Sequence, residues 1–267
     1  MADIKERTVM EQEPSQIEDE ANTLLVEEKY AQAHDLFKKA GSLYRSRRNH
    51  RQAALCFASA ASCWGIKCGE KTYSESAHLF ADAAKEAEAH FDYEYAATLY
   101  KQAAMYYERD GEFTNFAECF YESKESTRRS LGYLLLKSRK HRLSMGGGGF
   151  GDFVAAAKLF LKWSLLTASY LIWGHGEKPM RTLMVSLSLI FGASFLYSFC
   201  LLAKHGVPFH PTYFDALYLS TVTFATIGYG DITPLGIGKL IAMTEAFGSM
   251  FLLPLFLVGF SRKYLRF

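Results

Sequence analysis

The chain has 267 residues, which is enough for one or two domains of ordinary size. Its 30 Lys and Arg nearly balance its 28 Asp and Glu, and a net charge of +2 gives no indication of a nucleic-acid partner, so we expect none. The five cysteines are odd in number and lack the paired spacing of a zinc finger, which fits a reducing compartment rather than a disulfide framework.

The first 20 residues are acidic and contain no apolar run. Residues 1–28 carry nine acidic side chains and two basic ones. A secretory signal needs a basic start followed by an apolar stretch, so we expect residues 1–20 to be an acidic tail that stays in the cytosol. After Arg181 charge nearly vanishes over long stretches, so the sequence divides into a polar part and an apolar part.

Residues 21–130 contain five copies of one sequence pattern. Each copy combines a stretch of small residues with a central Leu or Cys that is followed by an aromatic residue. The central pairs are 20, 23, 20 and 20 residues apart, a period that holds one helix of about 15 residues and a short turn. Two such units make a helical hairpin. The central pairs are Leu36-Phe37, Cys56-Phe57, Leu79-Phe80, Leu99-Tyr100 and Cys119-Phe120.

These repeats resemble tetratricopeptide or SNAP-type repeats in their architecture. The resemblance implies stacked helical hairpins in a superhelix, whose concave face binds a cytosolic ligand or protein. Nothing in this part of the sequence indicates catalysis, so we expect neither an enzyme nor an organic cofactor.

Two segments separate the repeats from the apolar end of the chain. Residues 131–152 are basic and include a predicted four-glycine hinge, Gly146 to Gly149. This segment is either a solvated linker or one that anionic headgroups attract at the inner leaflet. Residues 153–178 are predicted to form a mostly apolar helix with a narrow cationic stripe at Lys158 and Lys162, which lies in the membrane interface or packs against the spans.

Two stretches near the C-terminus are long and apolar enough to cross a membrane. Between Arg181 and Lys204 lie 22 uncharged residues, and the 22 residues from Leu240 to Ser261 carry only Glu245. At 1.5 Å per residue each helix is about 33 Å long, which exceeds the hydrocarbon core of about 30 Å. Cations are more frequent outside this two-span unit than in its loop, so the positive-inside rule predicts cytosolic N- and C-termini in a plasma or inner cell membrane.

The loop between the spans carries a helix signal followed by an unusual turn. Thr212 and Asp215 have the spacing of a capping box, which predicts a helix from about residue 213 to residue 225. This helix is too short to cross the membrane, so it has to enter partway and return. The turn after it reads Thr226-Ile227-Gly228-Tyr229-Gly230-Asp231.

This turn resembles the filter signature of potassium channels, Thr-Val-Gly-Tyr-Gly-Asp, with Ile in place of Val. The resemblance covers Thr182 to about Phe260 and implies that residues 179–267 form a two-span pore domain, which assembles as a homotetramer in the lipid bilayer. It further implies that backbone carbonyls replace the water around K⁺ and that glycines supply positive φ values. The implied K⁺ ligands are the carbonyls of Thr226, Ile227, Gly228 and Tyr229, and Gly230 completes the filter.

The resemblance also assigns supporting roles around the filter. In similar channels an aromatic residue of the pore helix holds the filter Asp, which implies a contact between Tyr218 and Asp231. Val222 stands where some relatives have a carboxylate that pairs with this Asp, so that pairing is absent here.

Three residues of the second span are gating candidates. Glu245 is either a functional intramembrane charge or a neutral acid that bonds to the pore helix. Gly248 is either a hinge or a site of close helix packing, and Pro254 removes a backbone hydrogen bond and is expected to kink the span.

The sequence therefore predicts an all-α channel subunit in which a cytosolic helical-repeat domain modulates a passive K⁺ pore. Two alternatives remain open. The first is a non-selective cation channel, which reversal potentials in mixed Na⁺ and K⁺ would reveal. The second is a membrane-anchored helical-repeat adaptor with a vestigial pore, which an absence of K⁺ flux would favour.

Overall fold

The structure is a computed structural model that describes residues 13–67, 70–145 and 150–264. It is almost entirely helical, which confirms the predicted all-α class. The chain forms two compact units, Met1–Thr167 and Ala168–Phe267.

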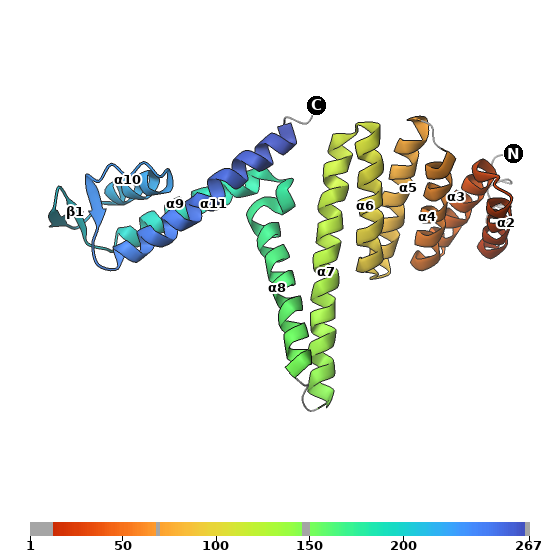
Figure 1. The fold of residues 1–267 in the computed structure, drawn as a ribbon, viewed down its shortest axis with the longest axis horizontal. Helices are drawn as coiled ribbons and strands as arrows, with labels where there is room; N and C mark the ends of the chain where they lie inside the picture. Colours follow the sequence, from red (N-terminus) through yellow and green to blue (C-terminus); the bar gives the residue numbers. More distant parts are fainter. Residues whose placement is uncertain (1–12, 68–69, 146–149, 265–267) are drawn as a thin grey trace. The chain divides into compact units, whose positions relative to one another are not determined.

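The helices of the first unit pack in chain order, each against the next (Figure 1). The described turns between them contain only a few residues, so consecutive helices run in opposite directions. This arrangement confirms the predicted helical repeat. The helices are α2 (Pro14–Val26), α3 (Tyr30–Ser46), α4 (His50–Lys67), α5 (Glu70–Ala89), α6 (Tyr93–Asp110) and α7 (Phe113–Met145).

Small and aromatic side chains together form the core of the repeat. Ala33, Ala40 and Ala53 have no exposed surface, so the helix backbones approach closely at these positions. Larger side chains of the central pairs, such as Phe37 and Leu99, fill the remaining space and are almost completely buried. The alternation of small and large residues is therefore what lets the helices stack.

Four turns between these helices share one backbone geometry. Glu28, Arg48, Phe91 and Gly111 have φ values between 59° and 78°. The residue after each of them donates its N–H to the carbonyl five positions earlier, at 2.9 Å in every case. This is the Schellman arrangement, which satisfies carbonyls that a helix end leaves unpaired. Because only one of the four residues is glycine, three of these turns carry no glycine signal in the sequence.

Both ends of the repeat extend beyond their predicted boundaries. α2 begins at Pro14, so part of the expected acidic tail is helical, and Ile17 is buried in the core. α7 continues to Met145, so residues 131–145 of the predicted linker are helical. Leu, Lys and Arg are good helix formers, and no proline interrupts this stretch. The predicted hinge at Gly146 to Gly149 lies outside the described residues.

A polar network joins α5 to α7. The buried carboxylate of Glu125 accepts hydrogen bonds from Arg128 and Arg129 at 2.6 to 3.1 Å. Arg129 also lies 3.4 Å from Glu88, which accepts a 2.6 Å hydrogen bond from Ser126. Burial opposes ionisation of Glu125, but the hydrogen bonds and positive charges of the two arginines outweigh it and lower the pKa of this carboxyl below its ordinary value of 4.5.

Glu125→Gln should destabilise the repeat at neutral pH and reduce its sensitivity to acid. A carboxyl whose pKa is lowered by folding stabilises the folded state above its unfolded pKa, and this stabilisation disappears as the pH falls through the folded pKa. We expect a loss of about 1–2 kcal/mol, because water partly screens the arginines. Thermal melts followed by the helical circular dichroism signal, at neutral and acidic pH, measure both effects. Glu94→Gln, on the exposed face of α6, is the control, and an unchanged acid sensitivity in the Glu125 variant would refute the assignment.

The second unit contains the two helices of the described chain that are long and apolar enough to cross a membrane. They are α9 (Pro179–Tyr197) and α11 (Gly238–Tyr264), with mean hydropathies of 1.4 and 1.8. The shorter α10 (Tyr213–Phe224) packs against both. α8 (Phe150–Trp173), where an interfacial helix is predicted, does not reach the same hydropathy and ends before the short helix η1 (Gly174–Gly176).

A small antiparallel sheet in the α9–α11 loop was not predicted. Strands β1 (Leu202–Lys204), β2 (Val207–Phe209) and β3 (Ile232–Pro234) lie in the order β2-β1-β3. His205 and Gly206 join β1 to β2 with φ values of 50° and 85°, which the two-residue hairpin turn with positive φ at both positions requires. Strands of three residues are too short for an alternating pattern to be recognised, which explains why the sequence predicts only helices here.

Candidate functional site

The site begins with α10, whose start is fixed by a capping box. Thr212 Oγ1 accepts a hydrogen bond from the N–H of Asp215 at 3.3 Å, and the Asp215 carboxylate accepts one from the N–H of Thr212 at 3.0 Å. These reciprocal bonds satisfy two N–H groups that a helix start otherwise leaves unpaired. The pair therefore fixes where α10 begins, and the helix ends at Phe224, just before the filter turn.

In the backbone after α10, every second residue has a positive φ. The N–H groups of Thr226 and Ile227 still donate to carbonyls of α10, at 3.0 Å each. The φ values are then 56° at Thr226, 60° at Gly228 and 77° at Gly230, whereas Ile227 and Tyr229 do not have positive φ. The five predicted filter residues thus form one continuous segment with alternating backbone conformation.

Glycine is needed in this segment because of the backbone conformation, and not because a side chain would clash with a neighbour. A Cβ built at Gly228 or Gly230 meets no atom within 4 Å, but both residues have a φ that L-amino acids rarely adopt. Thr226 has the same sign of φ although it is β-branched, which is a strained conformation of the kind that clusters at functional sites. The resemblance implied positive φ at the two glycines, whereas nothing in the sequence indicated it at Thr226.

Two hydrogen bonds hold the residue that follows the filter. The hydroxyl of Tyr218, on α10, donates to Asp231 Oδ2 at 3.0 Å. The N–H of His205, in the turn of the small sheet, donates to the Asp231 carbonyl at 3.1 Å. The structure thus brings Tyr218 and Asp231 together, as the resemblance implied, and adds a contact to the sheet that it did not imply. Val222 is buried on α10, and its apolar side chain has no group that could pair with Asp231.

Glu245 lies in a buried hydrogen-bond cluster in the middle of the second unit. Its carboxyl group is 1% exposed and accepts a hydrogen bond from the Tyr197 hydroxyl at 3.0 Å. The other carboxyl oxygen is bonded to the Ser220 hydroxyl, which also lies 2.9 Å from the carbonyl oxygen of Ile190. Tyr197 belongs to α9, Ser220 to α10 and Glu245 to α11, so this cluster joins both long helices to the short one. The contact with α10 was one of the two readings that the sequence left open, whereas Tyr197 was not foreseen.

The other two gating candidates lie in α11 itself. A Cβ at Gly248 would come within 3.1 Å of Leu189 Cδ2, so this glycine stands at a close contact between α9 and α11. Pro254 lies inside α11 and supplies no N–H for the helix.

A further ion pair, not foreseen from the sequence, connects the two ends of the second unit. Arg262, near the end of α11, lies 3.2 Å from Glu177, which is almost completely buried between η1 and α9. Gly176, with a φ of 92°, leaves room for Arg262, because a Cβ there would approach its guanidinium to 3.1 Å. The end of α11 is thus held to the segment that precedes α9.

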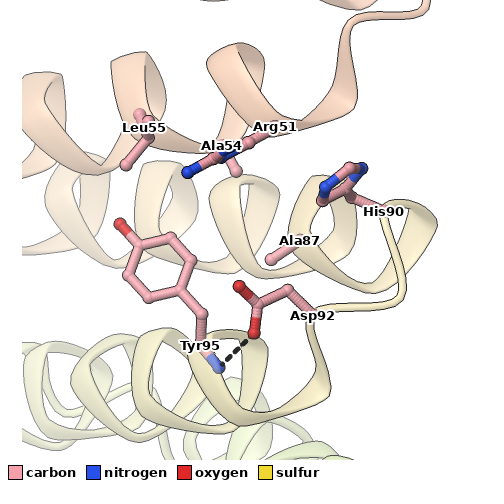
Figure 2. A pocket seen from close by; sticks show the side chains of 7 residues that line it. All are labelled: Arg51, Ala54, Leu55, Ala87, His90, Asp92 and Tyr95. Atoms are coloured by element: carbon pink, nitrogen blue, oxygen red, sulfur yellow. Dashed lines mark hydrogen bonds between the residues drawn. The ribbon is translucent and has the colours of Figure 1, made fainter.

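The repeat unit offers a separate small pocket. It has a volume of about 250 Å³ and is formed by residues of α4, the end of α5 and the start of α6 (Figure 2). Its polar groups are Arg51, His90 and Tyr95 together with Asp92, which caps α6 by accepting a hydrogen bond from the N–H of Tyr95 at 3.2 Å. Within the described residues no group of His, Cys, Asp and Glu side chains could hold a metal ion.

Comparison with known proteins assigns a different family to each end of the chain. Residues 183–266 match the family described as "Ion channel", and residues 18–132 match the family described as "Soluble NSF attachment protein, SNAP". The first match covers most of α9 together with α10, the filter turn and α11, whereas the second covers most of the helical repeat. One part of the chain is therefore similar to an ion-channel family and another part to the SNAP family, which agrees with the predicted order of a helical repeat followed by a channel-type pore region.

Individual relatives match only a short segment. Two proteins called "Protein LctB", from Bacillus caldotenax and Geobacillus stearothermophilus, are 56% and 59% identical to this chain over 32 residues. These residues are 12% of this chain and 24% of each relative, so the chain spans about a quarter of the length of the relatives. No solved structure matches the chain.

Proposed function

We propose that the chain is one subunit of a homotetrameric, potassium-selective channel. The observation that carries the proposal is a turn in which φ is positive at every second residue, Thr226, Gly228 and Gly230. A capped helix positions this turn between two apolar helices. Four copies of this turn around one axis would form stacked rings of backbone oxygens. Irregular backbone of this kind is tolerated at membrane depth where it lines the ion path.

The alternation explains how the turn would bind K⁺. Alternating conformations let successive carbonyl groups point toward the same side of the segment, where they replace the water around the ion. The carbonyls of Thr226, Ile227, Gly228 and Tyr229, together with the Thr226 hydroxyl, are the proposed ligands. Transport is passive, and an ion that crosses 100 mV gains about 2.3 kcal/mol.

The exposure of the filter side chains supports assembly into a tetramer. Ile227 and Tyr229 are 55% and 69% exposed in the single chain. Large apolar side chains at the edge of a functional turn are expected to be covered by a partner. In the proposed tetramer, neighbouring subunits cover them and keep the filter from collapsing.

The remaining parts are assigned by their position in the chain. α9 and α11 cross the plasma or inner cell membrane, with both termini on the cytosolic side, as the excess of cations outside the two-span unit favours. The helical repeat lies in the cytosol and modulates the pore through binding of a ligand or protein, for which the pocket at Arg51 and Tyr95 is one candidate position.

Flux through the purified full-length protein in liposomes tests the proposal. We expect K⁺ flux down its gradient, reversal potentials in mixed Na⁺ and K⁺ that follow K⁺, and a tetramer in lipid. Equal permeation of both ions would favour a non-selective cation channel. An absence of flux would favour a membrane-anchored adaptor, and a monomer or dimer in lipid would rule out a filter built from four turns.

A further inference from the structure

The turn between α8 and α9 has an unusual backbone and packs against α11. Its three residues Gly174, His175 and Gly176 are buried and have φ values of 56°, 56° and 92°. The turn contacts both α9 and α11. His175 is not a glycine, so its backbone is strained, and such strain persists only where the surrounding structure fixes the conformation. We call residues 169–182, which include this turn, the corner segment.

Side-chain bonds hold the corner segment together. The indole N–H of Trp173 donates to Ser169 Oγ at 2.8 Å, and the same oxygen lies 3.1 Å from His175 Nδ1. Arg181, in the first turn of α9, donates to the carbonyl of Tyr170 at 2.9 Å. Its guanidinium also lies over the Tyr170 ring, 4.7 Å from the ring centre. The last turn of α8 is therefore fixed to the first turn of α9.

α11 meets the corner segment at two places near its end. Arg262 lies 3.2 Å from the carboxylate of Glu177, which is 5% exposed. On the preceding turn of α11, a Cβ at Gly259 would lie 3.6 Å from the Cβ of Pro179, so the two backbones are close there. Removing the cation from a buried carboxylate is unfavourable, so the ion pair favours the arrangement in which α11 stays at the corner segment.

α11 is held at two points, with a proline between them. Glu245 accepts a hydrogen bond from Tyr197 at 3.0 Å, which holds the earlier part of α11 to α9. Arg262 holds the end of α11 to the corner segment. Pro254 lies between these points, and helices bend where a proline removes the backbone N–H. The part of α11 after Pro254 is therefore free to pivot about the proline once its contacts at the corner segment separate.

We propose that Glu177 and Arg262 form the latch of a gate at the C-terminal end of α11. While the pair is intact, the part of α11 after Pro254 stays against the corner segment. The channel changes between its conducting and non-conducting states when the pair separates and this part pivots. Because the corner segment also fixes the last turn of α8, the latch is the place where a movement of α8 reaches α11. The inference rests on the proposed pore.

Single-channel recordings of the full-length protein in lipid bilayers test the latch through Arg262→Gln. Loss of one partner of a buried charge pair speeds its separation, so the mean dwell time in the latched state should shorten at least about fivefold, and that in the other state should stay within about twofold. Arg262→Lys keeps the charge and should retain most of the dwell time. Lys263→Gln removes a charge from the adjacent exposed position and is the control. Unchanged dwell times in Arg262→Gln, or equal changes in both states, would overturn the proposal.

A disulfide between the two backbones tests the same movement directly. The 3.6 Å separation at Pro179 and Gly259 suits a disulfide, so Pro179→Cys combined with Gly259→Cys should cross-link α9 to α11. Oxidation should stop the switching between states and reduction should restore it, whereas wild-type switching in the cross-linked protein would refute the gate.

The rate of disulfide formation, followed by loss of reactive thiols, is a measurement that does not need K⁺ flux. Adding Arg262→Gln to the double-cysteine protein should slow cross-linking severalfold, because the two cysteines then spend less time together. Equal rates with and without Arg262→Gln would refute the latch itself. A protein that conducts no K⁺ would instead refute the proposed pore, so the two failures are distinguishable.

Discussion

Gly230→Ala is expected to abolish K⁺ selectivity or K⁺ conduction while the protein still inserts into the membrane. Gly230 has a φ of 77°, and a Cβ there would meet no atom within 4 Å, so the effect arises from the backbone alone. A left-handed conformation costs an L-residue about 1–2 kcal/mol. In the proposed tetramer this strain occurs four times in one ring, about 4–8 kcal/mol in total, which is enough to change the path of the carbonyls.

Gly236→Ala is the matched control for this prediction. Gly236 also has a positive φ, 51°, and also has no atom within 4 Å of a Cβ, but it lies between β3 and α11 and outside the filter. Its replacement should leave K⁺ flux within about tenfold of the wild type, since similar strain falls on a loop that can relax. Membrane extraction, K⁺ flux and reversal potentials distinguish the two variants. Wild-type K⁺ currents from Gly230→Ala would count strongly against the filter assignment.

The local signals of the sequence were reliable where a few adjacent residues determine the structure. Thr212 and Asp215 predicted the start of α10 because the capping box is complete within four residues. The positive φ of the two filter glycines was implied by the resemblance, and glycine adopts it at little cost. The contact between Tyr218 and Asp231 came from resemblance alone, since nothing in the intervening residues specifies it.

Features that depend on the whole fold left no such signal. Thr226 has positive φ because the helix before it and the glycines after it fix the path of the chain, against its own preference. The pair of Glu177 and Arg262 joins residues that are far apart in sequence. The start of α2 at Pro14 and the end of α7 at Met145 were not predicted. A strongly charged stretch favours a solvated tail or linker, but a helix can continue through it.

Glu245→Leu is expected to lower the selectivity for K⁺ over Na⁺ and to weaken the tetramer. The variant removes the acceptor of the buried Tyr197 hydroxyl, and an unsatisfied buried polar group costs about 1–3 kcal/mol. Ser220 keeps the Ile190 carbonyl as a neighbour but loses its bond to α11. α10, which carries the filter turn at its end, would then keep its packing against α11 but lose this hydrogen bond to it.

Glu245→Gln separates the hydrogen bonds from the charge. The amide retains an oxygen that can accept from Tyr197 and an NH₂ group that can donate to Ser220. If the cluster acts through these bonds, the Gln variant should select K⁺ nearly as the wild type does, and the Leu variant should be at least about tenfold less selective, which corresponds to about 1.4 kcal/mol. If a negative charge is required, both variants should fail alike. Thr244→Val, whose hydroxyl bonds only within α11, is the control for a polar-to-apolar change in the same turn.

A double-mutant cycle between Glu245→Leu and Tyr197→Phe measures how much of the effect passes through this cluster. The two side chains share one hydrogen bond, so their effects on the selectivity ratio and on the temperature of tetramer dissociation should be less than additive. A purely structural bond would move the dissociation temperature and leave selectivity unchanged. If selectivity and stability both fall in each single variant and fall no further in the double variant, α11 positions the filter through Glu245.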